Sequence, residues 1–312
     1  MTAPKPHIPT EGRVLNFDFP GLMIGVAEYE EGPTGCTVFV FDGAGLPFAA
    51  DVRGGSTGNI GLQYGFAKAI CFAGGSLMGL EAASGVAAEA FAERGHEHVD
   101  WNDVPAIAGA IIFDYGRRRT SIYPDRELGA AAYRAAAPGR FLLGRRGAGA
   151  SASVGKLLVE GTTSEFAGQG AAVRQVGETK VAVFTVVNAL GAVLDREGRV
   201  VRGNLDLKTG ERRLPLDAIG AAASAPGNTT LTLLVTNQAL DGRSMEQMAR
   251  QVHASMARAI QPFHTSQDGD TLLAVSTRTV QGGPLADAAK LGLLASEVAW
   301  DAVLASFEGG LN

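Results

Sequence analysis

The chain has few cysteines, no long basic run and no long apolar run among its 312 residues. The two cysteines, Cys36 and Cys71, lie inside apolar runs, so we expect buried free thiols and no disulfide. The longest run of basic residues is Arg117–Arg119, and the formal net charge is −5. These features argue against a nucleic-acid partner, and we interpret the arginine triplet as a solvated edge of the protein.

Membrane and targeting segments are also missing from the sequence. No stretch reaches 18 apolar residues without a charge or a glycine-rich break, and the first residues, MTAPKPHIPTEGR, lack the apolar centre of a signal peptide. We therefore expect a soluble, cytoplasmic protein without a membrane partner. The composition, 46% hydrophobic and 19% charged, predicts a globular chain that can bury a large core.

Several common motifs of cofactor and catalytic sites are absent. The glycine-rich segment GAGASASVGK (147–156) departs from the phosphate-loop fingerprint at Ala150 and again at Leu157. The sequence contains no Gly-x-Ser-x-Gly elbow, no His-Glu-x-x-His motif and no complete calcium loop. We therefore predict no metal and no cofactor, and we interpret His253 and His264 as structural residues.

The first two thirds of the chain predict mainly buried strands. Two β-rich runs, 22–29 and 36–41, are separated by the turn-like EEGPTG and predict a hairpin. The alanine-rich segment 61–95, interrupted by a Gly-Gly pair, predicts two helices. The continuous apolar runs 106–116 and 179–195 predict strands that are buried on both faces.

The last third predicts a strand (230–236), a helix (244–260), a second strand (271–276) and a final helix (284–307), after a charged, turn-rich surface segment. Ser244 and Gln247 have the spacing of a capping box. Five apolar residues of the first helix share one face and predict its buried stripe: Met245, Met248, Val252, Met256 and Ile260. Helices and buried sheets in both parts of the chain favour a layered α/β sandwich.

One segment, APGNTTLTLLVTN (225–237), carries the main functional question. It places a turn directly before two threonines and an apolar strand. In the simpler interpretation, a loop ends there and a strand begins. In the other, the bond between Asn228 and Thr229 is cut, and Thr229 becomes the first residue of a new chain. An N-terminal threonine combines a nucleophile with a base, because its α-amine has a pKa of about 7.7 to 8.

A second acidic segment is a candidate partner for that threonine. Asp268 and Asp270 are two residues apart, so an extended backbone can direct both carboxylates toward the hydroxyl and amine of Thr229. Gly269 between them permits close approach of the backbone. The alternative is an acidic turn without a catalytic role.

Eight segments, in order between Arg13 and Ser306, resemble the nylon hydrolases. These are endo-type 6-aminohexanoate-oligomer amide hydrolases within the L-aminopeptidase D-esterase and β-aminopeptidase family of self-cleaving N-terminal nucleophile hydrolases. The segments are EEGPTG (30–35), ICFAGGS (70–76), IYPD (122–125), GAGASASVGK (147–156), VVRGN (200–204), GNTT (227–230), QPFHT (261–265) and DGDTL (268–272).

The resemblance implies a four-layer αββα sandwich in which the precursor is cut between Asn228 and Thr229. The cut would give a large subunit, residues 1–228, and a small subunit, residues 229–312, which together form one folded domain. The family also implies a further assembly of these heterodimers, commonly to a tetramer.

The resemblance also implies the site residues and their roles. Thr229 matches the nucleophile, while Asp268 and Asp270 match the catalytic carboxylates. Lys156 matches a lysine beside the nucleophile, and Asn188 matches an asparagine that stabilises the oxyanion.

One position departs from the family pattern, because Phe113 stands where the nylon enzymes have an active-site tyrosine. If this segment is a strand, Tyr115 projects to the same face about 7 Å away and can supply the missing hydroxyl to the substrate. The implied substrate is an aliphatic polyamide oligomer cut at internal bonds. Two alternatives within the class are an aminopeptidase for β-amino or D-configured peptides and a pantetheine amidohydrolase. Outside the class, the chain could be a non-catalytic layered binding protein.

Overall fold

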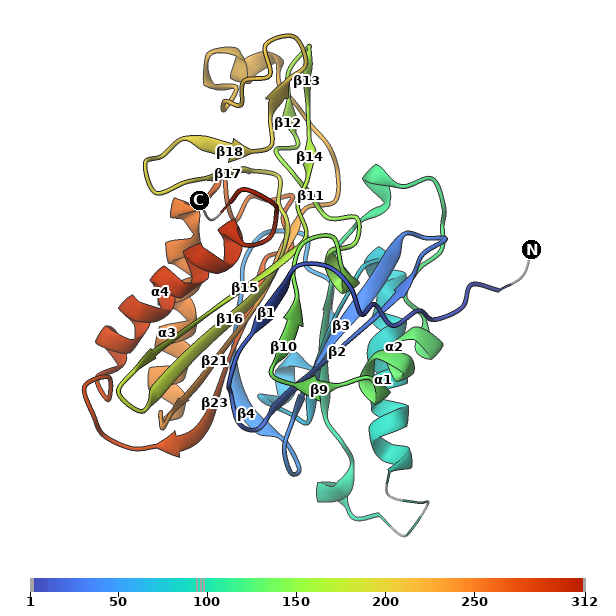
Figure 1. Ribbon diagram of the computed structural model, residues 1–312, viewed down its shortest axis with the longest axis vertical. Helices are drawn as coiled ribbons and strands as arrows, with labels where there is room; N and C mark the ends of the chain where they lie inside the picture. Colours follow the sequence, from blue (N-terminus) through green and yellow to red (C-terminus); the bar gives the residue numbers. More distant parts are fainter. Residues whose placement is uncertain (1–2, 94, 96, 98, 311–312) are drawn as a thin grey trace.

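Two six-stranded sheets pack face to face in the computed structural model, which describes residues 3–93, 95, 97 and 99–310. Two helices cover the outer face of each sheet, so the molecule has four layers in the order helix, sheet, sheet, helix (Figure 1). This mixed α/β arrangement agrees with the layered sandwich predicted from the sequence.

The first sheet belongs to the N-terminal half of the chain. Its strands, in spatial order, are β5 (Asn59–Ile60), β8 (Ile107–Ile111), β7 (Ala69–Ala73), β3 (Thr34–Phe41), β2 (Leu22–Tyr29) and β9 (Ala137–Pro138). The predicted hairpin is confirmed, since β2 and β3 pair antiparallel from Leu22 opposite Phe41 to Tyr29 opposite Thr34.

The second sheet combines strands from both halves of the chain. Its spatial order is β15 (Gln169–Val176), β16 (Thr179–Asn188), β21 (Thr229–Gln238), β23 (Thr271–Val280), β4 (Leu46–Val52) and β6 (Phe66–Ala67). The central pair, β21 and β23, is parallel, whereas β16 and β4 flank that pair in antiparallel directions. Residues that lie after Asn228 in sequence are therefore enclosed by strands that lie before it.

The strands read as continuous apolar runs because both of their faces are buried. In β3, Val38 and Val40 pack toward α1 and α2, while Phe39 and Phe41 pack into the layer between the sheets. That middle layer is rich in aromatic rings; Phe39, for example, lies 5.3 Å from the ring of Phe184 in the opposite sheet. Cys36 and Cys71 are buried and free, which confirms the absence of a disulfide between them.

The outer helices are α1 (Glu81–Ala92) and α2 (Arg126–Arg134) on the first sheet, and α3 (Gly242–Ser255) and α4 (Ala288–Leu304) on the second. The predicted capping box of α3 is wrong, because Asp241 caps this helix and its carboxylate accepts the backbone N–H of Ser244. All five residues of the predicted apolar stripe are buried in the core under α3 and α4, but the predicted helix is too long. Helix α3 ends at Ser255, Met256 lies in a 3₁₀ turn, and Ile260 begins a short strand.

Short strands form most of the remaining structure. They are β1 (Val14–Asn16), β10 (Arg140–Leu142), β11 (Ser153–Val154), β12 (Leu157–Leu158), β13 (Thr162–Thr163), β14 (Glu165–Phe166), β17 (Ala192–Leu194), β18 (Val200–Arg202), β19 (Leu205–Asp206), β20 (Ala223–Ser224) and β22 (Ile260–Gln261). Many of them belong to an extension that projects beyond the sandwich at the top of Figure 1. No helix in the described part of the chain is long and apolar enough to cross a membrane.

Three predictions for the first two thirds of the chain are met only in part. The segment 61–95 contains one α-helix and not two, because residues Ala69–Ala73 form the buried strand β7. A short run that is apolar on both faces does not distinguish a buried strand from a buried helix by periodicity. The run 106–116 leaves its strand at Ile111, and the run 179–195 is interrupted between β16 and β17.

Candidate active site

Thr229 is the first residue of β21, and it lies between strands that bring distant segments together. It pairs with Asn188, the last residue of β16, and the preceding Asn228 forms an isolated parallel bridge with Asp268. The side chain is buried, with 4% of the residue exposed. The sheet therefore gathers Thr229, Asn188 and the Asp268–Asp270 segment at one end of β21.

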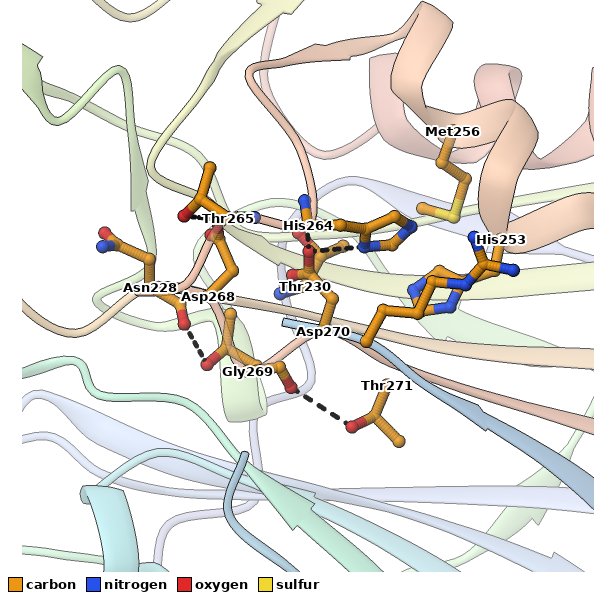
Figure 2. A network of polar contacts seen from close by, with 12 residues as sticks. Asn228, Thr230, His253, Met256, His264, Thr265, Asp268, Gly269, Asp270 and Thr271 are labelled. Carbon is orange, nitrogen blue, oxygen red and sulfur yellow. Dashed lines mark hydrogen bonds and ion pairs between the residues drawn. The ribbon is translucent and has the colours of Figure 1, made fainter. Parts of the chain in front are cut away.

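The carbonyl oxygen of Asn228 accepts two hydrogen bonds. The Thr229 hydroxyl donates one over 2.5 Å. The backbone N–H of Gly269 donates the other over 2.8 Å, and Figure 2 shows Asn228 beside Gly269. A Cβ atom on Gly269 would lie only 2.8 Å from the Thr229 Oγ1 and 2.6 Å from the carbonyl oxygen of Ser56. The expected close approach at Gly269 is therefore present, and the hydroxyl is held against the carbonyl group that precedes it.

Asp270 holds the backbone next to Thr229, Asp268 holds the segments around Thr265 and Leu190, and neither carboxylate contacts the Thr229 hydroxyl. Asp270 accepts the N–H of Thr230 at 2.7 Å, and its other oxygen accepts the backbone N–H and the Nδ1–H of His264. Asp268 accepts the hydroxyl and N–H of Thr265 and, more weakly, the N–H of Leu190 at 3.3 Å. In this uncut chain the expected direct contact with the Thr229 hydroxyl is not met, because that hydroxyl donates to Asn228 instead.

Burial dominates the electrostatics of Asp270. It raises the pKa of Asp270, and the charge of Asp268 adds to that rise, while the hydrogen bond from His264 opposes it. Both acids have no exposed surface. The His264 ring also lies 4.3 Å from that of His253 (Figure 2). The His253 Nδ1 is 2.9 Å from Asp51. The two histidines thus connect Asp270 to a second acid on β4.

Lys156 and Asn188 form a buried polar pair beside the same turn. The Lys156 Nζ donates to the Asn188 side-chain oxygen at 2.8 Å, to the Asn188 carbonyl at 3.0 Å and to the Gly227 carbonyl at 3.1 Å. Burial lowers the pKa of Lys156 to about 7, although Asp268 and Asp114 oppose this effect. The Asn188 Nδ2 donates to the carbonyls of Phe113 and Gly227. Both side chains therefore reach the backbone immediately before Asn228.

A cavity of about 220 Å³ lies next to this turn. Its walls include Lys156, Phe113, Tyr115 and the segment 225–227. Gly227 has a left-handed backbone, with φ of +81°, and a Cβ atom there would meet the Phe113 ring at 2.1 Å. The precursor turn therefore packs directly on Phe113 and forms part of the cavity wall.

The strand geometry expected for Phe113 and Tyr115 is wrong. Strand β8 ends at Ile111, and Tyr115 begins a 3₁₀ turn, η4 (Tyr115–Arg117). The two rings touch edge to face, 5.4 Å apart, and the Tyr115 hydroxyl donates to the Gly75 carbonyl at 3.3 Å. Both side chains line the cavity, but they reach it from a turn and not from one face of a strand.

The arginine triplet is also not a solvated edge as a whole. The Arg118 side chain is fully buried and pairs with Asp114 at 2.8 Å, and Asp114 in turn accepts the Thr34 hydroxyl and the Gly75 N–H. The sequence analysis missed this pair. An acid and an arginine four residues apart directly after a buried run are the signal that could have identified it.

The comparisons with known proteins agree with this arrangement. The model of peptidase family S58 matches residues 17–307. The chain is 45% identical over 311 residues to 6-aminohexanoate-oligomer endohydrolase from Paenarthrobacter ureafaciens, a match that covers 95% of this chain and 86% of that protein.

Solved structures show the same fold at low sequence identity. A β-aminopeptidase from Burkholderia sp. superposes with a TM-score of 0.66 at 17% identity, covering 97% of this chain and 89% of that one. The L-aminopeptidase D-Ala-esterase/amidase from Ochrobactrum anthropi, described as a variant of the Ntn hydrolase fold, has a TM-score of 0.66 at 14% identity, covering 95% and 87%. The chain therefore belongs to peptidase family S58 and is an amide hydrolase whose fold matches that of the Ntn-hydrolase aminopeptidases.

Proposed function

We propose that this protein is a self-processing amide hydrolase that cuts internal bonds of 6-aminohexanoate oligomers with Thr229 as its N-terminal nucleophile. The main support is the contact of the Thr229 hydroxyl with the Asn228 carbonyl, whose oxygen also accepts the Gly269 N–H. The substrate class is supported by the 45% identity to a 6-aminohexanoate-oligomer endohydrolase.

In the processing step, the Thr229 oxygen attacks the carbonyl carbon of Asn228. The carbon–nitrogen bond breaks, the hydroxyl proton passes to the Thr229 nitrogen, and the acyl group moves from that nitrogen to the Thr229 oxygen as an ester. The Gly269 N–H stabilises the negative charge that develops on the Asn228 oxygen. Water then hydrolyses the ester, which leaves a carboxylate on Asn228 and a free amine on Thr229.

The two fragments, residues 1–228 and 229–312, stay together as one folded unit. Strands β21 and β23 of the small fragment pair with β16 and β4 of the large fragment over residues 229–236 and 271–275, which supports this expectation. By analogy with the family, these heterodimers assemble further into a tetramer.

In the mature enzyme, the Thr229 oxygen attacks a substrate amide while the new α-amine accepts its proton and passes it to the leaving amine. Separation of Gly227 from the site frees the Asn188 Nδ2, which then donates to the substrate oxyanion. Lys156 keeps the Thr229 amine neutral through like-charge repulsion. Asp270 fixes the backbone N–H of Thr230 beside the nucleophile, and Asp268 fixes the adjoining segments at Thr265 and Leu190. Water releases the second product from the Thr229 ester.

The cavity beside Phe113 and Tyr115 receives the aliphatic chain of the substrate. Its apolar walls suit the methylene groups of such an oligomer, and the carbonyls nearby suit the amides. After cleavage, movement of residues 225–227 opens this cavity toward Thr229.

The test is the intact mass of the purified protein together with N-terminal sequencing of its fragments. We expect two chains, the smaller one beginning at Thr229, while Thr229→Ala remains a single chain and Thr229→Ser is still cut. A single full-length wild-type chain that hydrolyses oligomers would refute the mechanism, and one without amidase activity would favour a binding protein.

An aminopeptidase is the second candidate, because an aminopeptidase from Mycobacterium bovis is 33% identical over 253 residues. Products of a long linear 6-aminohexanoate oligomer separate the two activities. An endohydrolase releases intermediate lengths first, whereas an aminopeptidase releases single units from the amino end.

A further inference from the structure

A second, larger cavity of about 610 Å³ lies beside the proposed active site. Consecutive residues separate the two cavities, since Ala150 lines the larger one and Ser151 lines the smaller one. The ring of Phe166 lies in the same wall. The guanidinium of Arg145 from the larger cavity is 3.7 Å from its centroid, and that of Arg117 from the smaller cavity is 4.5 Å from it.

The larger cavity is lined by four arginines, of which two have acidic partners. Arg146 is 3.5 Å from Glu28, and Arg202 is 3.4 Å from Glu165. Within the described part of the chain, no ion pair is formed by Arg13 or by Arg145. The four arginines that line the larger cavity are Arg13, Arg145, Arg146 and Arg202.

The donors of the two unpaired arginines are largely unused. The Arg13 Nη1 is buried and has no hydrogen-bond partner among the described residues. Arg145 donates its Nε to the Ala150 carbonyl at 3.2 Å, which leaves its two terminal nitrogens available. Burial and the charge of Arg117 lower the pKa of Arg145. The charged form of its guanidinium is therefore disfavoured in the absence of an anion.

Three carboxylates also face this cavity, and two of them are engaged elsewhere. Glu28 accepts the Gly147 N–H besides its contact with Arg146, and Glu30 is 3.0 Å from His7. Glu308 is exposed at the rim. Arg13 and Arg145 therefore have no carboxylate partner among the described residues, and they offer a forked set of N–H donors that matches a carboxylate.

We propose that this second cavity binds the terminal carboxylate of a linear oligomer through Arg13 and Arg145. The inference rests on the proposed function, because it assigns a subsite to the same substrate. The chain then passes the Phe166 wall to reach Thr229. Because the carboxylate subsite and Thr229 lie a fixed distance apart, binding of the terminal carboxylate selects which amide bond reaches the nucleophile. Cleavage should therefore concentrate at a fixed number of units from the carboxyl terminus.

The experiment compares a linear 6-aminohexanoate oligomer that ends in a free acid with the same oligomer capped as a C-terminal carboxamide. The wild-type enzyme should have a KM for the free acid that is lower by about tenfold or more, as expected for hydrogen bonds to a charged group. Arg145→Gln should raise KM for the free acid to that of the carboxamide while kcat stays the same. Arg13→Gln should act in the same direction.

Arg119→Gln is the matched control, because Arg119 is exposed and lines neither cavity. This variant should leave KM and kcat for both oligomers unchanged. Equal KM values of the wild type for acid and carboxamide would overturn the inference while the proposed function stands. An Arg145→Gln variant whose KM rises equally for both substrates, or whose native mass changes, would also overturn the inference, because the arginine would then serve folding or assembly. Failure of the wild type to cut either oligomer would refute the proposed function itself.

Discussion

Substitution of Gly269 by alanine should slow processing of the precursor by about 10²-fold or more without unfolding it. The new Cβ would lie 2.6 Å from the Ser56 carbonyl oxygen and 2.8 Å from the Thr229 Oγ1. Ordinary van der Waals contact begins near 3.4 Å, so the backbone at Gly269 or the Thr229 side chain has to move by more than half an ångström.

That movement has two consequences of different size. As a case of local overpacking, it costs roughly 1–3 kcal/mol of folding stability, which a domain with a core of this extent tolerates. It also displaces the Gly269 N–H from the Asn228 oxygen and the hydroxyl from the carbonyl that it attacks. Loss of one such donor typically costs about 10²–10³ in rate. Processing should therefore suffer far more than folding.

The assay follows the conversion of the 312-residue chain into fragments on a denaturing gel, with intact mass at each time point and thermal unfolding of the same sample. Gly242→Ala is the matched control, because a Cβ atom at Gly242 would meet no other part of the chain within 4 Å. If Gly269→Ala is processed as fast as the wild type, the assignment of its N–H as a donor to the scissile carbonyl is wrong.

Two further predictions concern buried charges and are measured by urea unfolding of the uncut Thr229→Ala chain. The pKa of Lys156 is lowered from 10.5 to about 7, so between these pH values the unfolded chain binds more protons and stability rises with pH. Lys156→Met should flatten this rise by up to ~1.4 kcal/mol per pH unit, and an unchanged slope would contradict the lowered pKa. Arg118→Met should lower the unfolding free energy by about 3–5 kcal/mol, because Asp114 loses its buried partner; a loss below about 1 kcal/mol would contradict that pairing.

Local sequence signals predicted the parts of the fold that depend on neighbours in the chain. The hairpin of β2 and β3 follows from two β-rich runs around a turn, and α3 follows from its apolar stripe. Strand β7 did not follow, because it is a five-residue apolar run that is buried on both faces, a pattern that a buried helix shares. Its strand pairing with β3 and β8 depends on contacts that the local sequence does not encode.

The same division applies to the candidate site. Thr229 and the acids Asp268 and Asp270 stand in recognisable segments, so sequence alone could nominate them. The donation from the Gly269 backbone to Asn228 depends on how remote loops meet, and no residue type in the sequence indicates it. The burial of Arg118 also depends on remote segments, although its spacing from Asp114 is a local signal. The roles of Lys156 and Asn188 remain predictions, although both side chains reach Gly227.

The bridge between Asn228 and Asp268 joins segments that meet only after the second sheet has formed. If the Gly269 donor is needed for scission, a nascent chain cannot cut itself until the strand that follows this donor, β23, has docked beside β21. Self-scission would then report successful maturation, and a chain that fails to complete its sheet would remain an inactive precursor. The free α-amine and hydroxyl of Thr229 would thus appear together only in a chain that has already folded around them.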